Sequence, residues 1–382
     1  MNSSLAPGTE SGERPLGQGL SEWADRQAAK LMILPAVLIL LASAIFPLIV
    51  SAYLALSKFA LAPGGYELRF VGLRNFKKLW SGSQQYHFLG TFGQISLLEW
   101  LLLAALAAAI GTGLWRYARS GRASLVGSLG RAIAAVVGMG LAVLVLLVIN
   151  GKGFPGSLVV TLFYVAVGVA LQFALGLGLA LLCAQRIRGR SFFRVVFFIP
   201  LMVTPVGIAY TFRMLADMGK GPFAPLWQLF GLAEFSWAAD PWSARMVILL
   251  GDTWQWTPFM FLVLLAAIET QPRDQVEAAT IDGAGGWQVF RDITWPAIAP
   301  VAATIVLIRL IEAFKIIDLP NVLTNGGPGI ATESLTLHAF IAWRTQDLGG
   351  SAAVGYMLLF VAVVTCVSFF NFVTRRTRVL ET

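Results

Sequence analysis

One polar stretch, residues 269–296, has a pattern suited to binding another protein by shape. Its residues 275–282 favour a short helix, Gly283 breaks that helix, a second short helix follows, and Pro296 opens the next apolar run. Glycine permits a turn that other residues resist, and a proline in a first helical turn costs no hydrogen bond. Two adjacent alanines give the first helix one small side. Such a helix, exposed to the cytoplasm, is suited to docking in a groove of a partner.

A group of ionisable residues lies near the depth of the apolar runs, where a charge is expensive and usually faces a cavity or a partner. Arg309, Glu312 and Lys315 are spaced so that, on one helix face, the acid can pair with either base. The sequence leaves two interpretations open, an ion pair at a subunit interface or the polar lining of a translocation path. The residues concerned are Glu99, Arg213, Asp252, Arg309, Glu312 and Lys315.

The surroundings of Asp252 are suited to a sugar, because sugars are typically held by hydrogen bonds together with aromatic faces. An excess of base from Arg213, Arg309 and Lys315 would suit an anionic headgroup, such as a phosphate or a sulfonate. The aromatic and polar residues next to Asp252 are Trp254, Gln255, Trp256 and Thr257.

Several other chemistries have no support in the sequence. Cys183 and Cys366 lie in apolar runs and indicate helix packing. His87 and His338 are far apart in the chain and lack ligand-like neighbours, so we expect no metal site. No phosphate-binding G-x-x-x-x-G-K-[ST] string is present, and no Ser/His or paired-Asp arrangement indicates an enzyme. We therefore expect no catalytic residue and no cofactor bound by this chain.

The composition indicates a membrane protein. Of the 382 residues, 57% are hydrophobic and 13% are charged, whereas soluble domains carry about a quarter charged residues. The mean hydropathy is +0.74. The net charge of +8 comes from short basic clusters between apolar runs, without the interleaved aromatics of a nucleic-acid groove. Nucleic acid is therefore excluded as a partner, and membrane lipid is the expected surrounding.

The apolar runs predict an all-α membrane protein of about eight spans, since a spanning helix needs about 20 mostly apolar residues. The first run is too long for a signal peptide and is interpreted as a retained helix. The predicted spans are 31–56, 95–115, 132–149, 158–183, 192–216, 246–268, 297–317 and 352–373.

The basic loops predict the orientation. With eight spans, most arginine clusters fall on one side of the membrane, which the positive-inside rule makes the cytoplasm. We therefore expect a polar cytoplasmic tail at 1–30, a periplasmic loop at 57–94 and a cytoplasmic tail at 374–382. The clusters are Arg14, Arg26 and Lys30; Arg116, Arg119, Arg122 and Arg131; Arg186, Arg188, Arg190 and Arg194; Arg273 and Arg291; and Arg375, Arg376 and Arg378.

Two features within the spans concern packing. Small residues repeat every fourth position in the span 158–183, which lets two helices approach closely in lipid. Pro200, Pro205 and Pro258 predict kinks in the spans that contain them. The small residues are Ala166, Ala170, Ala174 and Gly178.

The stretch 269–296 also resembles a known motif. It is similar to the EAA motif of binding-protein-dependent importer permeases, which has the pattern E-A-A, three residues, G, nine residues, I-x-L-P; Trp295 replaces the usual leucine. The resemblance implies a coupling helix that sits in a cleft of an ATPase subunit, with Glu277 meeting basic groups there. We call residues 269–296 the coupling segment. The matching residues are Glu277, Ala278, Ala279, Asp282, Gly283, Ala284, Ile293 and Pro296.

Two further strings resemble the carbohydrate-uptake branch of these permeases, which includes maltose and glycerol-phosphate permeases. Residues 70–76, FVGLRNF, are similar to a string that follows the first span. Residues 323–328, LTNGGP, followed by Thr332 and Glu333, are similar to a string before the last span. The glycines and proline of the second string predict a tight turn, which we expect on the periplasmic side.

The resemblance implies a six-helix importer core, formed by the first span and by residues 158–373, with an extra helical pair at 95–149 of unassigned role. It implies a multi-pass subunit of the bacterial inner membrane that carries a sugar or sugar derivative. The implied partners are a second homologous permease, an ATPase dimer that uses ATP and magnesium, and a periplasmic binding protein. The alternative is a secondary transporter driven by an ion gradient, which would not explain the coupling segment.

Overall fold

The computed structural model describes residues 28, 32–63, 65–93, 96–119, 125–149, 154–185, 189–231 and 235–380. Most of the predicted N-terminal tail and the loop residues Arg122, Arg186 and Arg188 lie outside these ranges. The chain divides into two compact units, 1–54 and 55–382, and each is described separately. In the first unit, a helix begins at Met32 and contains the π-helical turn η1; its last turn ends at Ala55.

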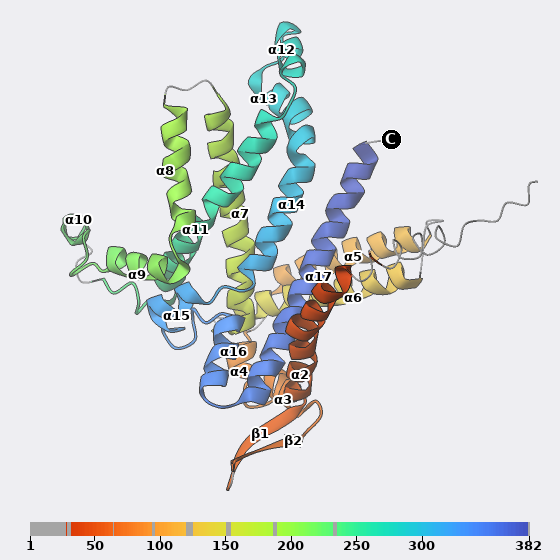
Figure 1. Cartoon of the computed structure of the whole chain (residues 1–382), viewed down its shortest axis with the longest axis vertical. Coiled ribbons are helices and arrows are strands. Elements are labelled where there is room, and N and C mark those ends of the chain that lie inside the picture. Colours follow the sequence, from red (N-terminus) through yellow and green to blue (C-terminus); the bar gives the residue numbers. More distant parts are fainter. Residues whose placement is uncertain are drawn as a thin grey trace, which may run out of the picture. The chain divides into compact units, whose positions relative to one another are not determined.

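The elements run in the order shown in Figure 1. They are η1 (Leu41–Ile45), α2 (Phe46–Ala55), β1 (Ser57–Ala62), β2 (Gly65–Phe70), α3 (Arg74–Ser81), α4 (Gln85–Phe88), α5 (Leu97–Ala118), α6 (Leu125–Ile149), α7 (Ser157–Ala184), α8 (Arg190–Met202), α9 (Pro205–Ala216), α10 (Ala224–Leu229), α11 (Pro241–Glu269), α12 (Arg273–Ile281), α13 (Gly286–Val289), η2 (Phe290–Thr294), α14 (Trp295–Ala313), α15 (Asp318–Thr324), α16 (Leu335–Arg344) and α17 (Leu348–Leu380).

The predicted helical membrane fold is confirmed. Within the described residues, seven helices are long and apolar enough to cross a membrane, and a bent pair brings the number to eight. The predicted span 192–216 is the bent pair: α8 and α9 meet at an angle of 101°. Thr204 precedes Pro205 and has φ −65° and ψ 145°, because a residue before proline is disfavoured in the α region. The kink predicted in this span is therefore confirmed, and it is sharp enough to divide the span into two helices.

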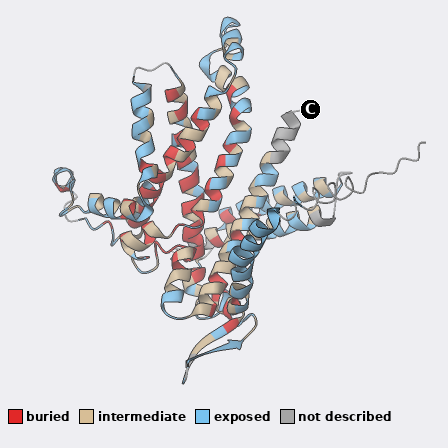
Figure 2. Cartoon of the chain, in the orientation of Figure 1, coloured by how far each residue is buried: buried red, intermediate tan, exposed pale blue. Residues whose placement is uncertain are grey.

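The centre of the second unit is the contact between α7 and α11, with α14 and α17 packed alongside (Figure 2). A Cβ built on Gly176 of α7 would lie 2.5 Å from the Cβ of Met260. The predicted small-residue stripe Ala166, Ala170, Ala174 and Gly178 does not make this contact, since all four residues are exposed. The buried face of α7 instead carries Gly168, Gln172, Gly176 and Ala180. The stripe was assigned to the wrong face for packing within this chain.

A pair of glycine substitutions tests this assignment. Gly176→Ala should lower the stability of the purified chain by about 1–3 kcal/mol, because the new methyl group overpacks a closed interface. Gly178→Ala should be neutral or slightly stabilising, since nothing lies within 4 Å of the position that its new Cβ would take and alanine favours helix. Thermal unfolding in detergent measures both variants. Equal effects would contradict the observed facing of α7.

The predicted loop 57–94 is largely ordered into secondary structure. β1 and β2 form an antiparallel hairpin with Ser57 opposite Phe70, and the FVGLRNF string turns from β2 into α3 at Gly72, whose φ is +58°. The buried Asn75 amide donates hydrogen bonds to the carbonyl oxygens of Ala55 (2.9 Å) and Ser57 (2.8 Å). Asn75 therefore fixes the start of the hairpin against α3.

The chain segments before and after the extra helical pair, α5 and α6, meet at one point of the second unit. Gly90 and Pro155 form a β-bridge, and a Cβ on Gly156 would lie 2.5 Å from the Gly90 nitrogen. Gly90 has φ +99°, a conformation that glycine adopts without strain. Glu99, predicted as a candidate for an intramembrane charge, accepts a 2.8 Å hydrogen bond from the Ser96 backbone and completes a capping box at the start of α5. Its role is thus local.

The LTNGGP string forms a tight turn, as predicted. Asn325 and Gly326 have φ values of 49° and 85°. The Thr324 and Thr332 hydroxyls lie 2.6 Å apart, and the Thr332 hydroxyl donates to the Gly327 carbonyl oxygen at 2.9 Å. These bonds close the turn across its base and hold the chain that leads into α16.

Candidate functional site

The coupling segment forms the helix–turn–helix that its sequence predicts. Helix α12 ends at Ile281, and Gly283 follows with φ +86°. The Ala284 N–H donates to the Ala279 carbonyl oxygen at 2.9 Å, and the Gly283 N–H donates to the Thr280 carbonyl oxygen at 3.1 Å. This glycine-dependent stop is a common end for a helix, and it fixes the direction in which α13 starts.

The outer surface of α12 is free of packing in this chain. No α12 residue is buried, and Figures 1 and 2 show α12 as a mostly exposed helix at one end of the bundle. Apolar side chains are also exposed here: Ile281 at the end of α12 is 85% exposed, and Trp287 on the following α13 is 71% exposed. Among the described residues, Glu277 has no hydrogen bond or ion pair. Exposed apolar residues beside an unpaired acid fit a docking surface.

A hollow of about 580 Å³ lies between α12 and the start of the next long helix. Three residues of the motif, Ala278, Ala279 and Asp282, line its α12 side. Ala279 and Ala284 are half-buried, whereas Glu277, Ala278, Asp282 and Gly283 are exposed. Ala278, Ala279 and Asp282 therefore lie on one small surface, and Gly283 follows them in the turn that ends α12.

The second helix of the coupling segment is continuous with the following span. The prediction had Pro296 opening a new helix at about residue 297, but the spanning helix runs from Gly286 to Ala313. A π-helical stretch, Phe290–Thr294, precedes the proline. Local π-helical turns accommodate a residue that breaks the regular hydrogen-bond ladder. Helix α13 is thereby joined to α14 without an intervening loop.

A buried polar cluster joins three helices in the middle of the unit. The Arg309 guanidinium of α14 lies 2.5 Å from the Asp252 carboxylate of α11 and donates to the Gln172 amide oxygen of α7 at 2.7 Å. Gln172 donates in turn to Asp252 at 2.8 Å. Arg309 also lies 4.6 Å from the centre of the Trp256 ring. The Arg309 and Asp252 side chains are 1% and 5% exposed, so the cluster is closed to solvent in this conformation.

The other residues predicted for the substrate path face different surroundings. Gln255 is buried, whereas Trp254 is 42% exposed. Trp254 lines a mostly apolar groove of about 610 Å³ between α7, α8 and α11, together with Thr253 and Thr257. The Thr253 hydroxyl is buried and has no hydrogen-bond partner among the described residues. This groove therefore offers an aromatic face from Trp254, with the buried Thr253 hydroxyl behind its wall.

The three bases do not act together. Glu312 pairs with Lys315 at 2.6 Å on an exposed surface, while Arg309 reaches across to Asp252 instead of to Glu312. Arg213 donates to the Val322 carbonyl oxygen at 3.0 Å and, within the described residues, has no carboxylate partner. The predicted excess of base is thus reduced to one guanidinium beside the turn that precedes α16.

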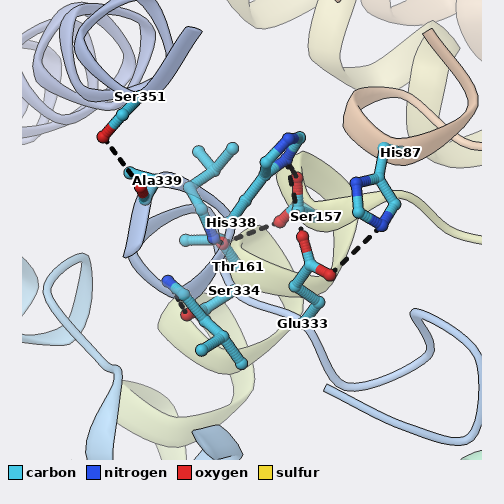
Figure 3. A network of polar contacts seen from close by, with 10 residues as sticks. His87, Ser157, Thr161, Glu333, Ser334, His338, Ala339 and Ser351 are labelled. Carbon is cyan, nitrogen blue, oxygen red and sulfur yellow. Dashed lines mark hydrogen bonds and ion pairs between the residues drawn. The ribbon is translucent and has the colours of Figure 1, made fainter. Parts of the chain in front are cut away.

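The structure brings together two histidines that the sequence left apart. His87 of α4 and His338 of α16 have ring centres 4.7 Å apart, and both rings lie next to Glu333 (Figure 3). The expectation that they lack ligand-like neighbours was wrong. Only the tertiary fold reveals this, because α4 and α16 belong to distant parts of the chain; the Thr-Glu string at 332–333 was the one local signal.

The fold and the exposed coupling segment define a membrane subunit of a transporter. The family described as the binding-protein-dependent transport system inner membrane component matches residues 172–379. Since this is more than half of the chain, the protein belongs to that family. It is an inner membrane component of a transport system.

Individual relatives agree with this assignment. The trehalose/maltose transport system permease protein MalF of Thermococcus litoralis is 36% identical over 218 residues, which cover 57% of this chain and 74% of that protein. The sn-glycerol-3-phosphate transport system permease protein UgpA of Escherichia coli O157:H7 is 30% identical over 194 residues, or 50% of this chain and 65% of that protein. A bacterial ABC transporter involved in the import of the acidic polysaccharide alginate shares the fold, with a TM-score of 0.52, 19% identity and coverage of 72% and 96%.

Proposed function

We propose that this chain is the permease subunit of an ATP-driven importer and forms the translocation path for a sugar or sugar derivative. The observation that carries the proposal is the exposed α12 with the turn after it: α12 carries Glu277 and Ala278 of the EAA-like motif, the turn carries Gly283, and all three residues are exposed. The names of the relatives, a trehalose/maltose and a glycerol-phosphate permease, support a sugar-type substrate. Membership of the family supports import.

The coupling segment is the proposed contact with a separate ATPase dimer. ATP and magnesium would bind to that partner, and this chain would hold no cofactor. Closure of the ATPase would push on α12, and because α13 continues into α14, the push would reach the cluster of Arg309, Asp252 and Gln172. The bundle would then alternate between inward-facing and outward-facing states, as a two-state equilibrium shifted by ligands.

One chain supplies one coupling segment, whereas a symmetric ATPase dimer offers two clefts. We therefore propose a second, homologous permease as partner, and a periplasmic binding protein that delivers the sugar. In this arrangement α12 and both chain termini face the cytoplasm. The turn at 323–328 lies at the opposite end of the bundle from α12 (Figure 1) and would face the periplasm.

We propose the groove beside Trp254 as the part of the path nearest the substrate. It presents the partly exposed Trp254 ring in a mostly apolar groove. Because Arg309 and Lys315 are each neutralised by a carboxylate, the charge balance favours a neutral sugar over an anionic one. The exposed guanidinium of Arg213 is the remaining candidate for an acidic group.

Trp254→Ala should weaken uptake by roughly 2–10-fold, which corresponds to the ~0.5–1.5 kcal/mol of an aromatic contact. The loss should appear as a higher KM, because the residue binds substrate and does not transmit force. Uptake of radiolabelled maltose and trehalose into proteoliposomes containing the whole transporter measures this effect.

Trp100→Ala is the matched control, since Trp100 is 56% exposed on α5 and lies outside the groove. Equal effects of the two substitutions would argue against the groove as the path.

The dependence of uptake on ATP separates the proposed function from the gradient-driven alternative. Proteoliposomes containing the complex should accumulate sugar only with internal ATP and with the binding protein outside. Uptake that follows an imposed ion gradient without ATP would contradict the importer. The coupling segment gives no reason to expect that result.

A further inference from the structure

We propose that His87, Glu333 and His338 form a binding site for a divalent transition-metal ion, of which Zn²⁺ fits best, at the end of the bundle opposite α12. The site is independent of the coupling segment and of the groove beside Trp254. Figure 3 shows both imidazole rings directed at the Glu333 carboxylate.

The distances match those of a metal centre. One ligand atom from each of the three residues lies within 4.8 Å of the others. The His87 Nε2 atom is 3.3 Å from Glu333 Oε2, and the His338 Nδ1 atom is 3.5 Å from Glu333 Oε1. Zinc with bonds of ~2.0–2.1 Å in tetrahedral geometry places neighbouring ligand atoms about 3.4 Å apart. A small closure of the carboxylate on the ion would complete the geometry.

The ligand chemistry is selective. Two imidazoles with one carboxylate form a set suited to zinc and similar transition metals, whereas magnesium and calcium prefer oxygen ligands throughout. The Ser157 hydroxyl lies 2.9 Å from His338 Nδ1, the atom that would bind the ion, so coordination would replace this hydrogen bond. The ion is expected to enter past His87, whose side chain is 30% exposed, compared with 3% for Glu333.

The buried carboxylate of the site has an oxygen atom that a metal ion would satisfy. The Glu333 side chain is 3% exposed, and its Oε1 atom is buried without a hydrogen-bond partner among the described residues. A buried carboxylate oxygen without such a partner is costly, and a divalent cation bound there would remove that cost.

The fold holds the ligands in place before any ion binds. The Ser334 hydroxyl caps α16 by accepting from the Leu337 N–H at 3.1 Å and donates to the Ile316 carbonyl oxygen at 2.6 Å. The Leu335 N–H donates to the Thr161 hydroxyl of α7 at 2.8 Å. On the other side, the close approach of Gly90 to Gly156 fixes α4 over the start of α7. Preorganised ligands of this kind favour affinity.

The bound ion would join two distant segments, α4 through His87 and the start of α16 through Glu333 and His338. Both of them lie in the second unit. A metal clamp would hold the hairpin and α3–α4 region on the helical bundle while the bundle changes conformation. Its expected effect is on stability at this end of the molecule and not on the supply of ATP energy.

The test uses the full transporter complex, purified with a tag that contains no histidine and stripped with a chelator. This chain has only two histidines, so each variant addresses the proposed site alone. Zn²⁺ is added back, and its stoichiometry and affinity are measured by elemental analysis and by competition with a fluorescent chelator. Co²⁺ in its place reports tetrahedral coordination through its visible absorption.

The wild-type complex should retain one zinc ion more than the His87→Ala complex. The zinc affinity of the His87→Ala site should be at least ~100-fold lower than that of wild type, because substitution of residues that only support the ligands already lowers metal affinity about 10–100-fold. Glu333→Gln should lose the same ion. Tyr86→Ala is the matched control because Tyr86 is 48% exposed next to His87; it should keep the ion. Equal zinc content in wild type and His87→Ala, or loss of the ion in Tyr86→Ala alone, would overturn the proposal.

Discussion

The double substitution Glu277→Ala with Gly283→Asp should abolish uptake and detach the ATPase from this chain. Glu277 is exposed and unpaired among the described residues, so its removal costs the fold little and takes away the acid offered to the partner. Gly283 has φ +86°, and an aspartate there strains the turn that aims α13. The measurement is co-purification of the ATPase in mild detergent, together with ATP-dependent sugar uptake.

Two comparisons make the result specific. Glu67→Ala removes an exposed acid on β2, far from α12 in the sequence, and should leave both ATPase recovery and uptake unchanged. The double variant should also unfold within a few degrees of wild type, because α12 has no buried residue to lose. Wild-type recovery of the ATPase by the double variant would mean that another surface makes the contact.

The coupling segment could be predicted from the sequence because its signals are local. The helix-forming run 275–282, Gly283 and the spacing of the EAA-like motif all lie within one short stretch. The run predicts the short helix, and the glycine predicts where that helix ends. The continuity of α13 with α14 could not be predicted in the same way. Pro296 usually marks a helix start, and only the π-helical turn at Phe290–Thr294 allows the helix to run past it.

The helical faces could not be predicted with the same success. In a span that is apolar on every side, burial leaves no period in the sequence. The sequence alone therefore does not show whether the face with Gly178 or the face with Gly176 is buried. The close approach of Gly176 to Met260 shows that the Gly176 face packs against α11. Likewise, the local spacing favoured Glu312 as the partner of Arg309. The tertiary fold instead offers Asp252, which is buried with it.

The histidine cluster is a second example of contacts that the sequence does not predict. His87 and His338 carry no spacing that predicts a metal site, because their meeting depends on the bridge between Gly90 and Pro155. His87 and His338 therefore gain their proposed role from a tertiary contact that no sequence pattern near either histidine indicates. The polar cluster around Arg309 is built in this way too, from three helices.

Arg309→Met should destabilise the chain by about 3–5 kcal/mol, because it leaves the Asp252 carboxylate buried without its partner. The Arg309 side chain is 1% exposed and that of Asp252 is 5% exposed, so solvent water cannot stabilise the Asp252 carboxylate once the guanidinium is removed. Denaturant or thermal unfolding of the purified chain in detergent measures the loss. Lys315→Met breaks the exposed pair with Glu312 and, as the control, should cost about 0–1 kcal/mol.

Arg309 pairs inside this chain and not at a subunit interface, so removing both charges separates a packing role of the pair from a role in the translocation path. Arg309→Met combined with Asp252→Leu should recover most of the stability, since a buried ion pair is often replaced by apolar groups at little cost. If that folded variant transports normally, the pair serves the packing of α11 and α14 alone. If it is stable and cannot transport, Arg309 and Asp252 must separate during the cycle, and at least one of them must then face the sugar. The second outcome would make the closed cluster the resting state of a gate, because its charges are satisfied only while the path is shut.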